Sequence, residues 1–303
     1  MAPGSFALLN LKKFNMKWFL AGNRGLVGTN FSNTYSCTGV NTSTCNLEKY
    51  NETLYALYKE NPTHVMINAA TVGGLVDDIN YSFDIYIKNL TIQNNIFKAC
   101  KELNIKNVLL QGSTCMYPSM FANEYVEEDL FKGKPHESYL STALIKLIGL
   151  EQCRTANTLY NFSWKTAIPT NLFGPHDKVS KVIGALMQKF ITNNGIIEIW
   201  GSGKQERDFL YVKDAITAFE LIMNSNYDVV NVVSGTIVSI SELVDILIQI
   251  SGFKGKIKYD TSKPEGIFKR SMSNKRLQSL GWKPNYTLED ALAETYQWYY
   301  DNT

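Results

Sequence analysis

The sequence has few of the residues that mark disulfide scaffolds and metal modules. Its 303 residues include five cysteines and three histidines. The cysteines form no CxxC pair and show no zinc-ligand spacing, so we expect free thiols in a reducing compartment. His64, His136 and His176 show no metal-ligand spacing either. The sequence therefore predicts no metal site.

An excess of charge of one sign is also absent. Lysine and arginine number 30 against 28 aspartates and glutamates, a net charge of +2, which gives no reason to expect a nucleic-acid partner. No hydrophobic run approaches the roughly 18 residues of a membrane span. The apolar stretch 5–11 is too short for a signal peptide and ends at two lysines. We expect a soluble, cytoplasmic protein without a membrane partner, with secretion as the alternative because seven Asn-X-Ser/Thr triplets occur.

Hydrophobic residues are plentiful and follow the pattern of an α/β fold. They make up 45% of the chain and charged residues 19%, which is the composition of a globular protein. Short buried runs alternate with helical patterns, the runs at 17–21, 64–70, 107–113 and 163–169 and the helices at 92–103 and 141–157. Such alternation predicts a doubly wound parallel sheet of Rossmann type, which binds ligands at the carboxyl ends of its strands.

A glycine-rich turn follows the first predicted strand. Gly22, Gly25 and Gly28 recur at intervals of three and precede a helix. Glycine lets the backbone approach a pyrophosphate, which the N–H groups of the helix N-terminus then hold. Arg24 can add a charge-assisted contact to phosphate, and a purely structural turn is the alternative. The stretch 35–44, where ribose selectivity is normally decided, holds no acidic residue for NAD and no arginine for NADP.

The alternation of strands and helices weakens after Asn171. Only 240–252 and 288–301 have helical patterns there, which predicts a smaller C-terminal lobe. We expect three parts: an N-terminal extension at 1–16, a dinucleotide-binding domain at 17–170 with a further segment near 205–235, and a substrate lobe at 171–303.

Other candidate residues lie at a strand end, on a helix and in a loop. Ser113 closes a predicted strand, where its hydroxyl can bind a substrate oxygen. Thr142 and Lys146 lie four residues apart and so share one side of a helix. Trp200 and Arg207 can supply a stacking face and a phosphate contact. Each has an ordinary structural alternative, namely a small strand end, a solvated lysine or a tryptophan packed in a turn.

Several segments together resemble one enzyme family. They are 21–28, 69–74, 112–118, 169–177, 200–214 and 262–266. On these segments the chain resembles the extended short-chain dehydrogenase/reductase superfamily and, within it, the GDP-L-fucose synthase family of GDP-4-keto-6-deoxymannose epimerase-reductases. The resemblance implies a Rossmann-type α/β fold with a smaller lobe for a GDP-sugar substrate. It also implies NADP as the cofactor, with NAD not excluded, and a homodimer formed by two helices of each subunit.

The resemblance also assigns site residues. The family's catalytic serine and lysine fall on Ser113 and Lys146, whereas Thr142 stands where an ungapped alignment places its catalytic tyrosine. The family's epimerase cysteine falls on Cys115, and Lys181 replaces the partner histidine. The implied cofactor-binding residues are Gly22, Asn23, Arg24, Gly25, Leu26, Val27, Gly28, Ala69, Ala70, Thr71, Lys146, Pro169, Asn171 and Leu172. The implied substrate-binding residues are Asn171, Val182, Trp200, Arg207 and Arg270.

Two of these replacements weaken acid–base chemistry. A phenol has a pKa of about 10, whereas a threonine hydroxyl is far less acidic and makes a poor proton donor. Loss of a positioned acid typically costs ~10²–10⁴-fold in rate. Tyr139 is a substitute near Thr142, but it would lie about 10.5 Å from Lys146 along the axis if both residues were helical. Lys181 could deprotonate a carbon only if its pKa were lowered.

These observations favour an NAD(P)H-dependent C4-reductase of a GDP-4-keto-6-deoxy sugar, a hexose or a heptose, with weak or absent epimerase activity. In this hypothesis Ser113 and Thr142 bind the C4 oxygen and Lys146 fixes the ribose. One alternative is a catalytically degenerate nucleotide-sugar-binding or regulatory homologue. The other is an NAD-dependent nucleotide-sugar epimerase or dehydratase.

Overall fold

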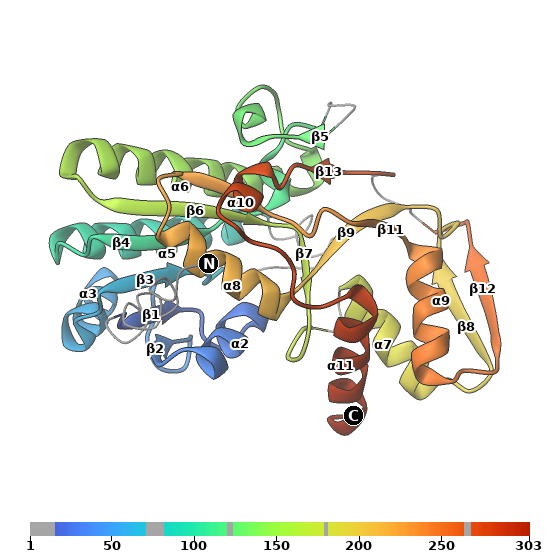
Figure 1. Cartoon of the computed structure of the whole chain (residues 1–303). Helices are drawn as coiled ribbons and strands as arrows, with labels where there is room; N and C mark the ends of the chain where they lie inside the picture. The colour runs from blue at the N-terminus through green and yellow to red at the C-terminus, as the bar shows by residue number, and fades with distance from the viewer. Residues whose placement is uncertain (1–15, 71–81, 120–123, 179–180, 264–267) are drawn as a thin grey trace, which may run out of the picture.

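One six-stranded parallel sheet organises the chain, of which the computed structural model describes residues 16–70, 82–119, 124–178, 181–263 and 268–303 (Figure 1). The strand order is β10 (Val229–Val232), β6 (Ser163–Pro169), β4 (Asn107–Gln111), β3 (His64–Ile67), β1 (Trp18–Ala21) and β2 (Cys37–Val40). The chain runs from β1 outward to β2 and returns to β3 on the other side of β1. This reversal creates a topological switch point at the carboxyl end of β1, where such sheets bind ligands.

Successive residues of β1 point to opposite faces of the sheet, and each face has its own core. Trp18 and Leu20 pack in a cluster with α2 (Leu26–Thr34) and α8 (Val212–Met223). Phe19 and Ala21 belong to a second cluster, which includes residues of α3 (Tyr50–Glu60), α5 (Ser82–Glu102) and α6 (Leu140–Tyr160). Because both faces are covered, a central strand such as β1 is a continuous apolar run in the sequence.

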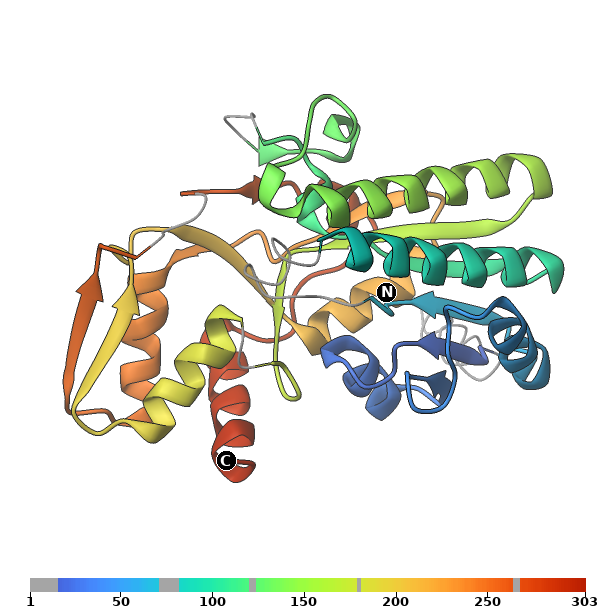
Figure 2. The same cartoon turned by 180° about the vertical axis from the view of Figure 1, so that it is seen from behind.

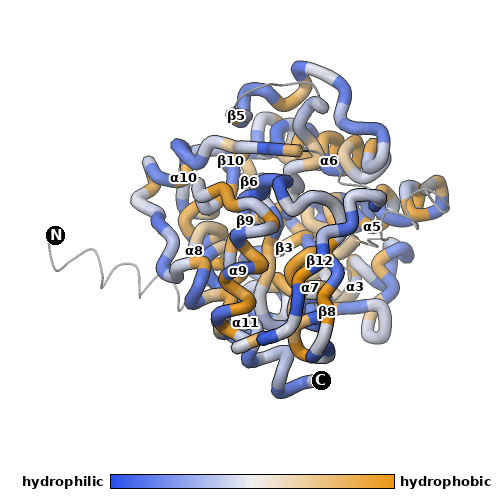
Figure 3. The backbone as a smooth tube through the Cα atoms, turned by 90° about the vertical axis from the view of Figure 1, so that its right-hand side faces the viewer, coloured by the Kyte–Doolittle hydropathy of each residue, from blue (hydrophilic) through white to orange (hydrophobic). Residues whose placement is uncertain are grey.

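A smaller lobe lies beyond the carboxyl ends of these strands (Figures 1 and 2). It contains the parallel pair β8 (Ile196–Trp200) and β12 (Lys256–Asp260) and the helices α7 (Val182–Thr192), α9 (Ile240–Ser251) and α11 (Leu288–Asp301). A three-stranded sheet of β7 (Asn171–Phe173), β9 (Glu206–Tyr211) and β11 (Ile237–Ser239) connects the two parts. Hydrophobic residues concentrate on α9 and β8 (Figure 3), and they join the same core cluster as α2 and α8.

The remaining elements are short: η1 (Thr114–Met116), β5 (Glu124–Tyr125), η2 (Glu127–Asp129), η3 (Glu137–Tyr139), β13 (Ser271–Met272) and α10 (Lys275–Ser279). β13 pairs with β5 in parallel. Arg270 directly precedes β13 and contacts η1, which follows β4. A residue near the end of the chain thus reaches the carboxyl edge of the main sheet.

The expected Rossmann-type fold is confirmed. The strand predicted at 163–169 coincides with β6, and the helix predicted at 141–157 lies within α6. We had no expectation for α3, which has few buried residues, or for α7, although α7 buries Ile183, Leu186, Met187 and Phe190. In the described part of the chain, no helix is both long enough and apolar enough to cross a bilayer.

Candidate active site

The predicted glycine turn connects β1 to α2 and is closely packed. Gly22 has a φ of +99°, and a Cβ atom there would lie 2.8 Å from the backbone nitrogen of Ala69. A Cβ at Gly28 would lie only 2.2 Å from the carbonyl oxygen of Gly22. At Gly25, in contrast, a Cβ would meet nothing within 4 Å among the described atoms. Two of the glycines therefore bring α2 against the turn, and the third borders open space.

The N-terminus of α2 fits an anionic group in that space. Gly25 caps the helix without a side-chain hydrogen bond, and the first turn holds no acidic residue. The first N–H groups of α2 and the exposed Arg24 can therefore face a pyrophosphate. The side chains of Leu26 and Val27 are buried in the core, so only their backbone can take part.

The next strand ends border the same turn. The Asn68 amide nitrogen donates to the carbonyl oxygen of Gly22 at 3.0 Å, and its Oδ1 atom is buried without a partner among the described residues. Ala69 and Ala70 follow it and are partly buried, whereas the predicted Thr71 lies outside the described residues. Beyond β2, the Asn41 amide donates to Oδ1 of Asn23 at 3.0 Å.

The predicted reaction residues meet at the carboxyl end of β4. Oγ of Ser113 accepts from the backbone N–H of Cys115 at 3.3 Å. The Arg270 guanidinium donates to the carbonyl oxygen of Thr114 at 3.0 Å. The buried Cys115 thiol interacts electrostatically with Lys146 and Arg270. Four predicted site residues from three separate segments thus surround one point.

The ammonium of Lys146 is poorly solvated at this point. Burial lowers the pKa of its ammonium to about 8, and the nearby Cys115 thiol opposes this shift. Burial also raises the pKa of the Cys115 thiol, against the effects of Ser113 and of the Lys146 and Arg270 charges. The thiol therefore stays protonated near neutral pH, which disfavours its action as a base. Thr142 lies one helical turn before Lys146 on α6 and is partly buried.

Tyr139 belongs to the same group, although the sequence argument set it aside. It directly precedes α6 and ends η3, so it is not part of the regular helix that carries Lys146. Its hydroxyl accepts from the Arg270 guanidinium at 2.6 Å. Tyr139 also interacts electrostatically with Cys115 and Arg207. The place where the helix begins would have revealed this position, but sequence patterns fix helix ends only within a few residues.

Lys181 is paired with an acidic residue, Asp177. Its Nζ atom is 2.9 Å from Oδ1 of Asp177, whose side chain is 2% exposed. Burial raises the pKa of the Asp177 carboxyl, and the Lys181 ammonium opposes that shift. Asp177 was not predicted as a site residue. Val182, next to Lys181, is exposed at the start of α7.

Of the other predicted residues, Arg207 interacts electrostatically with Arg270 and Tyr139. The Asn171 amide donates to the backbone oxygen of Asp208 at 2.9 Å, beside Arg207. Arg207 itself donates to the carbonyl oxygens of Glu206 and Phe268. The side chains of Pro169 and Leu172 are buried in β6 and β7.

Trp200 lies apart from the reaction residues. It ends β8, is 61% exposed and has the Lys263 ammonium 5.7 Å from its ring centre. A ring this exposed is available for stacking.

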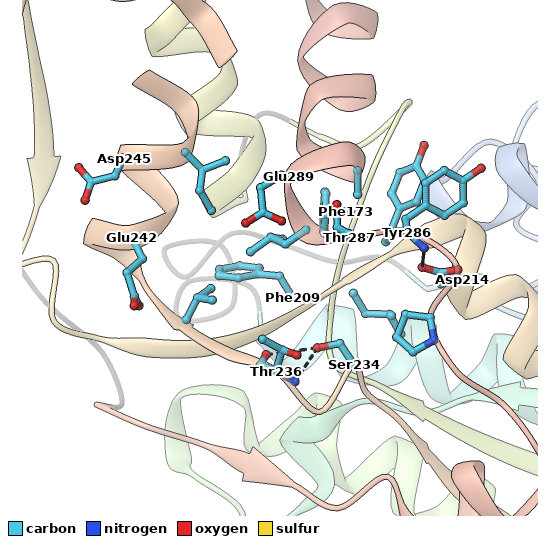
Figure 4. A pocket seen from close by; sticks show the side chains of 17 residues that line it. Phe173, Phe209, Asp214, Ser234, Thr236, Glu242, Asp245, Tyr286, Thr287 and Glu289 are labelled. Carbon is cyan, nitrogen blue, oxygen red and sulfur yellow. Dashed lines mark hydrogen bonds between the residues drawn. The ribbon is translucent and has the colours of Figure 1, made fainter. Parts of the chain in front are cut away.

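A separate cavity of about 550 Å³ lies in the C-terminal lobe between β9, β11, α9 and α11 (Figure 4). It contains none of the predicted site residues. Two of its carboxylates have structural roles, since Glu242 caps α9 through Ser239 and Asp214 accepts from the backbone of Asn285 and Tyr286. The candidate active site is therefore the edge of the main sheet, not this cavity.

Residues 18–233 match the family model of the NAD dependent epimerase/dehydratase family. A GDP-L-fucose synthase of Sinorhizobium fredii is 33% identical over 299 residues, which cover 94% of this chain and 95% of the relative. The GDP-L-fucose synthase of Escherichia coli is 31% identical over 309 residues and covers 94% and 96%. Among solved structures, a GDP-mannoheptose C4 reductase of Campylobacter jejuni with NADP bound has a TM-score of 0.86 at 26% identity, with 94% of this chain and 98% of that one covered.

Proposed function

Because the chain belongs to the NAD dependent epimerase/dehydratase family, we propose that it is an NADPH-dependent reductase of the C4 carbonyl of a GDP-4-keto-6-deoxy sugar. The sugar is a hexose or a heptose. Two lines of similarity support this function: GDP-L-fucose synthases match nearly the whole chain, and a C4 reductase of a GDP-heptose shares its fold. The five cysteines, all free thiols, are consistent with a cytoplasmic enzyme.

The cofactor is assigned to residues 17–170 and the segment near 205–235, and the GDP-sugar to the lobe at 171–303. The open space at Gly25 and the uncapped N-terminus of α2 suit the pyrophosphate. When bound, the reduced nicotinamide supplies the hydride that the carbonyl carbon accepts. NADP is preferred because the C. jejuni reductase was solved with it, not because of any residue after β2.

The observation that carries the proposal is the meeting of Ser113, Lys146 and Arg270 around Cys115. In this proposal Ser113 donates a hydrogen bond to the C4 oxygen, and Thr142 binds the same oxygen. Lys146 binds the ribose hydroxyls and adds positive charge close to the carbonyl. Arg207 and Arg270 provide charge for the diphosphate of the sugar nucleotide, and Asn171, Val182 and Trp200 extend that surface.

Epimerisation at C3 and C5 is not part of this proposal. It would need a base at Lys181, but the ammonium of Lys181 is paired with the buried carboxylate of Asp177. The nitrogen that would have to accept a proton from carbon therefore contacts a buried carboxylate oxygen at 2.9 Å. The Cys115 thiol, whose pKa burial raises, is no better as a base.

We also propose a homodimer, formed through α5 and α6. Each helix has 21 residues, and a groove of about 1090 Å³ runs along their outer surface. Leu144, Ile148 and Leu159 line it and are between 38% and 65% exposed. A second copy of the same helix pair would bury these apolar side chains in a two-fold arrangement.

The test is a single-turnover reaction of the protein with GDP-4-keto-6-deoxymannose and NADPH, repeated with NADH, with the sugar products resolved by NMR. We expect oxidation of NADPH and a C4 alcohol with unchanged configuration at C3 and C5. If the protein binds the cofactor but oxidises it with neither this substrate nor a 4-keto heptose analogue, the reductase proposal is wrong and a binding role replaces it.

A further inference from the structure

Reduction of a ketone needs a proton donor as well as a hydride. The hydride adds to the carbonyl carbon, and the oxygen must gain a proton to become a hydroxyl. Thr142 is a poor source, because an aliphatic hydroxyl is much less acidic than a phenol, whose pKa is about 10. Among the described residues that interact with Cys115 and Arg270, Tyr139 carries a phenol to which no role has been assigned.

The position of Tyr139 is fixed from two sides. Its ring packs against that of His136, with the ring centres 5.3 Å apart, and the His136 side chain in turn accepts from the backbone N–H of Ser138. Its hydroxyl accepts from one Arg270 nitrogen at 2.6 Å, while the other nitrogen donates to Thr114 at 3.0 Å. Through these two hydrogen bonds, Arg270 connects the Tyr139 hydroxyl to the segment after β4 that contains Ser113 and Cys115.

The charges around Tyr139 suit a proton donor. Burial raises the pKa of the phenol, so the phenol keeps its proton at neutral pH, as a donor must. The Arg270 guanidinium opposes this rise through its charge and its hydrogen bond, and Arg207 adds to the effect. The same guanidinium would stabilise the phenolate that remains after the proton has left.

Spacing along a helix does not argue against Tyr139. The axial separation from Lys146 would apply only if both residues lay on one regular helix, but α6 begins at Leu140. Tyr139 has a φ of −136° and a ψ of 25°, which is not helical backbone. Both Tyr139 and Lys146 interact electrostatically with the same thiol, that of Cys115.

We propose that Tyr139 donates the proton to the C4 oxygen of the sugar and that Arg270 is the positioning residue that holds its hydroxyl. This inference rests on the proposed reductase function. In the step, the carbonyl carbon gains a hydride from the reduced nicotinamide, which is thereby oxidised. The O–H bond of Tyr139 breaks, a new O–H bond forms on the sugar, and the phenolate recovers its proton from solvent.

The first test compares single-turnover rates of Tyr139→Phe, Thr142→Val and the matched control Tyr58→Phe, an exposed tyrosine on α3. We expect Tyr139→Phe to lose ~10²–10⁴-fold in the rate of NADPH oxidation, the usual cost of a missing acid. Tyr58→Phe should match the wild type. Cofactor binding and thermal unfolding of each variant show whether it is folded.

The second test reads the phenol directly, without turnover. The absorbance change of phenolate formation is followed by pH titration of the wild type, Arg270→Ala and Arg270→Lys, each with and without Tyr139→Phe. The difference within each pair isolates Tyr139. Arg270→Ala should move the Tyr139 titration to higher pH, and Arg270→Lys should restore part of the shift because it keeps a positive charge.

Two results separate this inference from the function on which it rests. If the wild type reduces the sugar and Thr142→Val loses its rate while Tyr139→Phe keeps it, Thr142 is the donor and the inference is wrong, but the reductase stands. If none of the 4-keto sugar nucleotides tested causes the wild type to oxidise NADPH, the reductase proposal fails and the inference fails with it. An unchanged titration in Arg270→Ala would remove the positioning role of Arg270.

Discussion

The ammonium of Lys181 lies 2.9 Å from the carboxylate of Asp177, four residues earlier in the chain. The pair is asymmetric, since the Asp177 side chain is 2% exposed and that of Lys181 is 51% exposed. A second carboxylate oxygen of Asp177 is buried without a partner among the described residues. Breaking the ion pair to free Lys181 as a base would leave a buried carboxylate uncompensated, which is costly.

This pair predicts the stereochemical outcome of the reaction. With the reaction run in D₂O, we expect no deuterium at C3 or C5 of the product, because the Lys181 nitrogen is held by Asp177 and does not act as the base that removes those hydrogens. NMR of the isolated product is the measurement. Lys181→Ala should give the same labelling pattern as the wild type. Deuterium at either carbon in the wild type, lost in Lys181→Ala, would contradict the prediction and make Lys181 an epimerisation base.

The pKa of Lys146 predicts the alkaline limit of activity. Burial lowers it to about 8, so the ammonium that adds positive charge close to the carbonyl loses its proton as the pH rises through that value. The single-turnover rate at saturating cofactor should therefore fall above about pH 8. Lys146→Arg keeps its charge at all accessible pH and should lose this alkaline limb, even if its absolute rate is lower. An alkaline limb of the same midpoint in Lys146→Arg would assign it to another group.

The glycine turn predicts a separation of stability from cofactor binding. Gly25→Ala should leave the free energy of unfolding within about 1 kcal/mol of the wild type, because its Cβ meets no atom of the described residues within 4 Å and its φ of −79° is ordinary. The same methyl group would enter the space assigned to the pyrophosphate, so NADPH binding should weaken at least tenfold. Isothermal titration and chemical denaturation measure the two effects.

Gly28→Ala is the contrasting variant for that experiment. Its Cβ would lie 2.2 Å from the Gly22 oxygen, which no side-chain rotation can relieve. We expect it to lose both stability and cofactor affinity. If Gly25→Ala binds NADPH as tightly as the wild type, the pyrophosphate does not lie at this helix end.

The sheet was predictable because its strands and its glycine turn leave patterns within short stretches of sequence. Strands buried on both faces, such as β1, are continuous apolar runs, and the glycine turn after β1 has a spacing that few other structures need. The C-terminal lobe was harder, since strands as short as β11 carry no periodic signal. The candidate site could be predicted only in part. Ser113 and Lys146 follow from strand and helix positions, whereas Arg270 and Tyr139 meet only through the fold, across more than a hundred residues of sequence.

If the groove along α5 and α6 forms the dimer interface, introducing charged residues into it should dissociate the dimer. Leu144→Glu combined with Ile148→Glu places two carboxylates on the outer surface of α6, where each residue is more than a third exposed. Sedimentation should show a dimer for the wild type and a monomer for this variant, because like charges would face each other across the two-fold axis. Tyr58→Glu on α3 is the control and should stay dimeric. A monomeric wild type would refute the interface.

Asp208 predicts an unusual pH dependence of stability. Burial raises the pKa of its carboxyl from 3.8 to about 6, although the backbone N–H groups of Ser234 and Gly235 donate to it and oppose the shift. Between these two values the folded protein holds a proton that the unfolded chain has lost. The free energy of unfolding should therefore fall as pH rises through this window, by about 3 kcal/mol in total. Chemical denaturation of the wild type and Asp208→Asn across the window measures this, since only the wild type carries the titrating group. Stability curves that run parallel would mean that Asp208 is already ionised in the folded protein at the acid end.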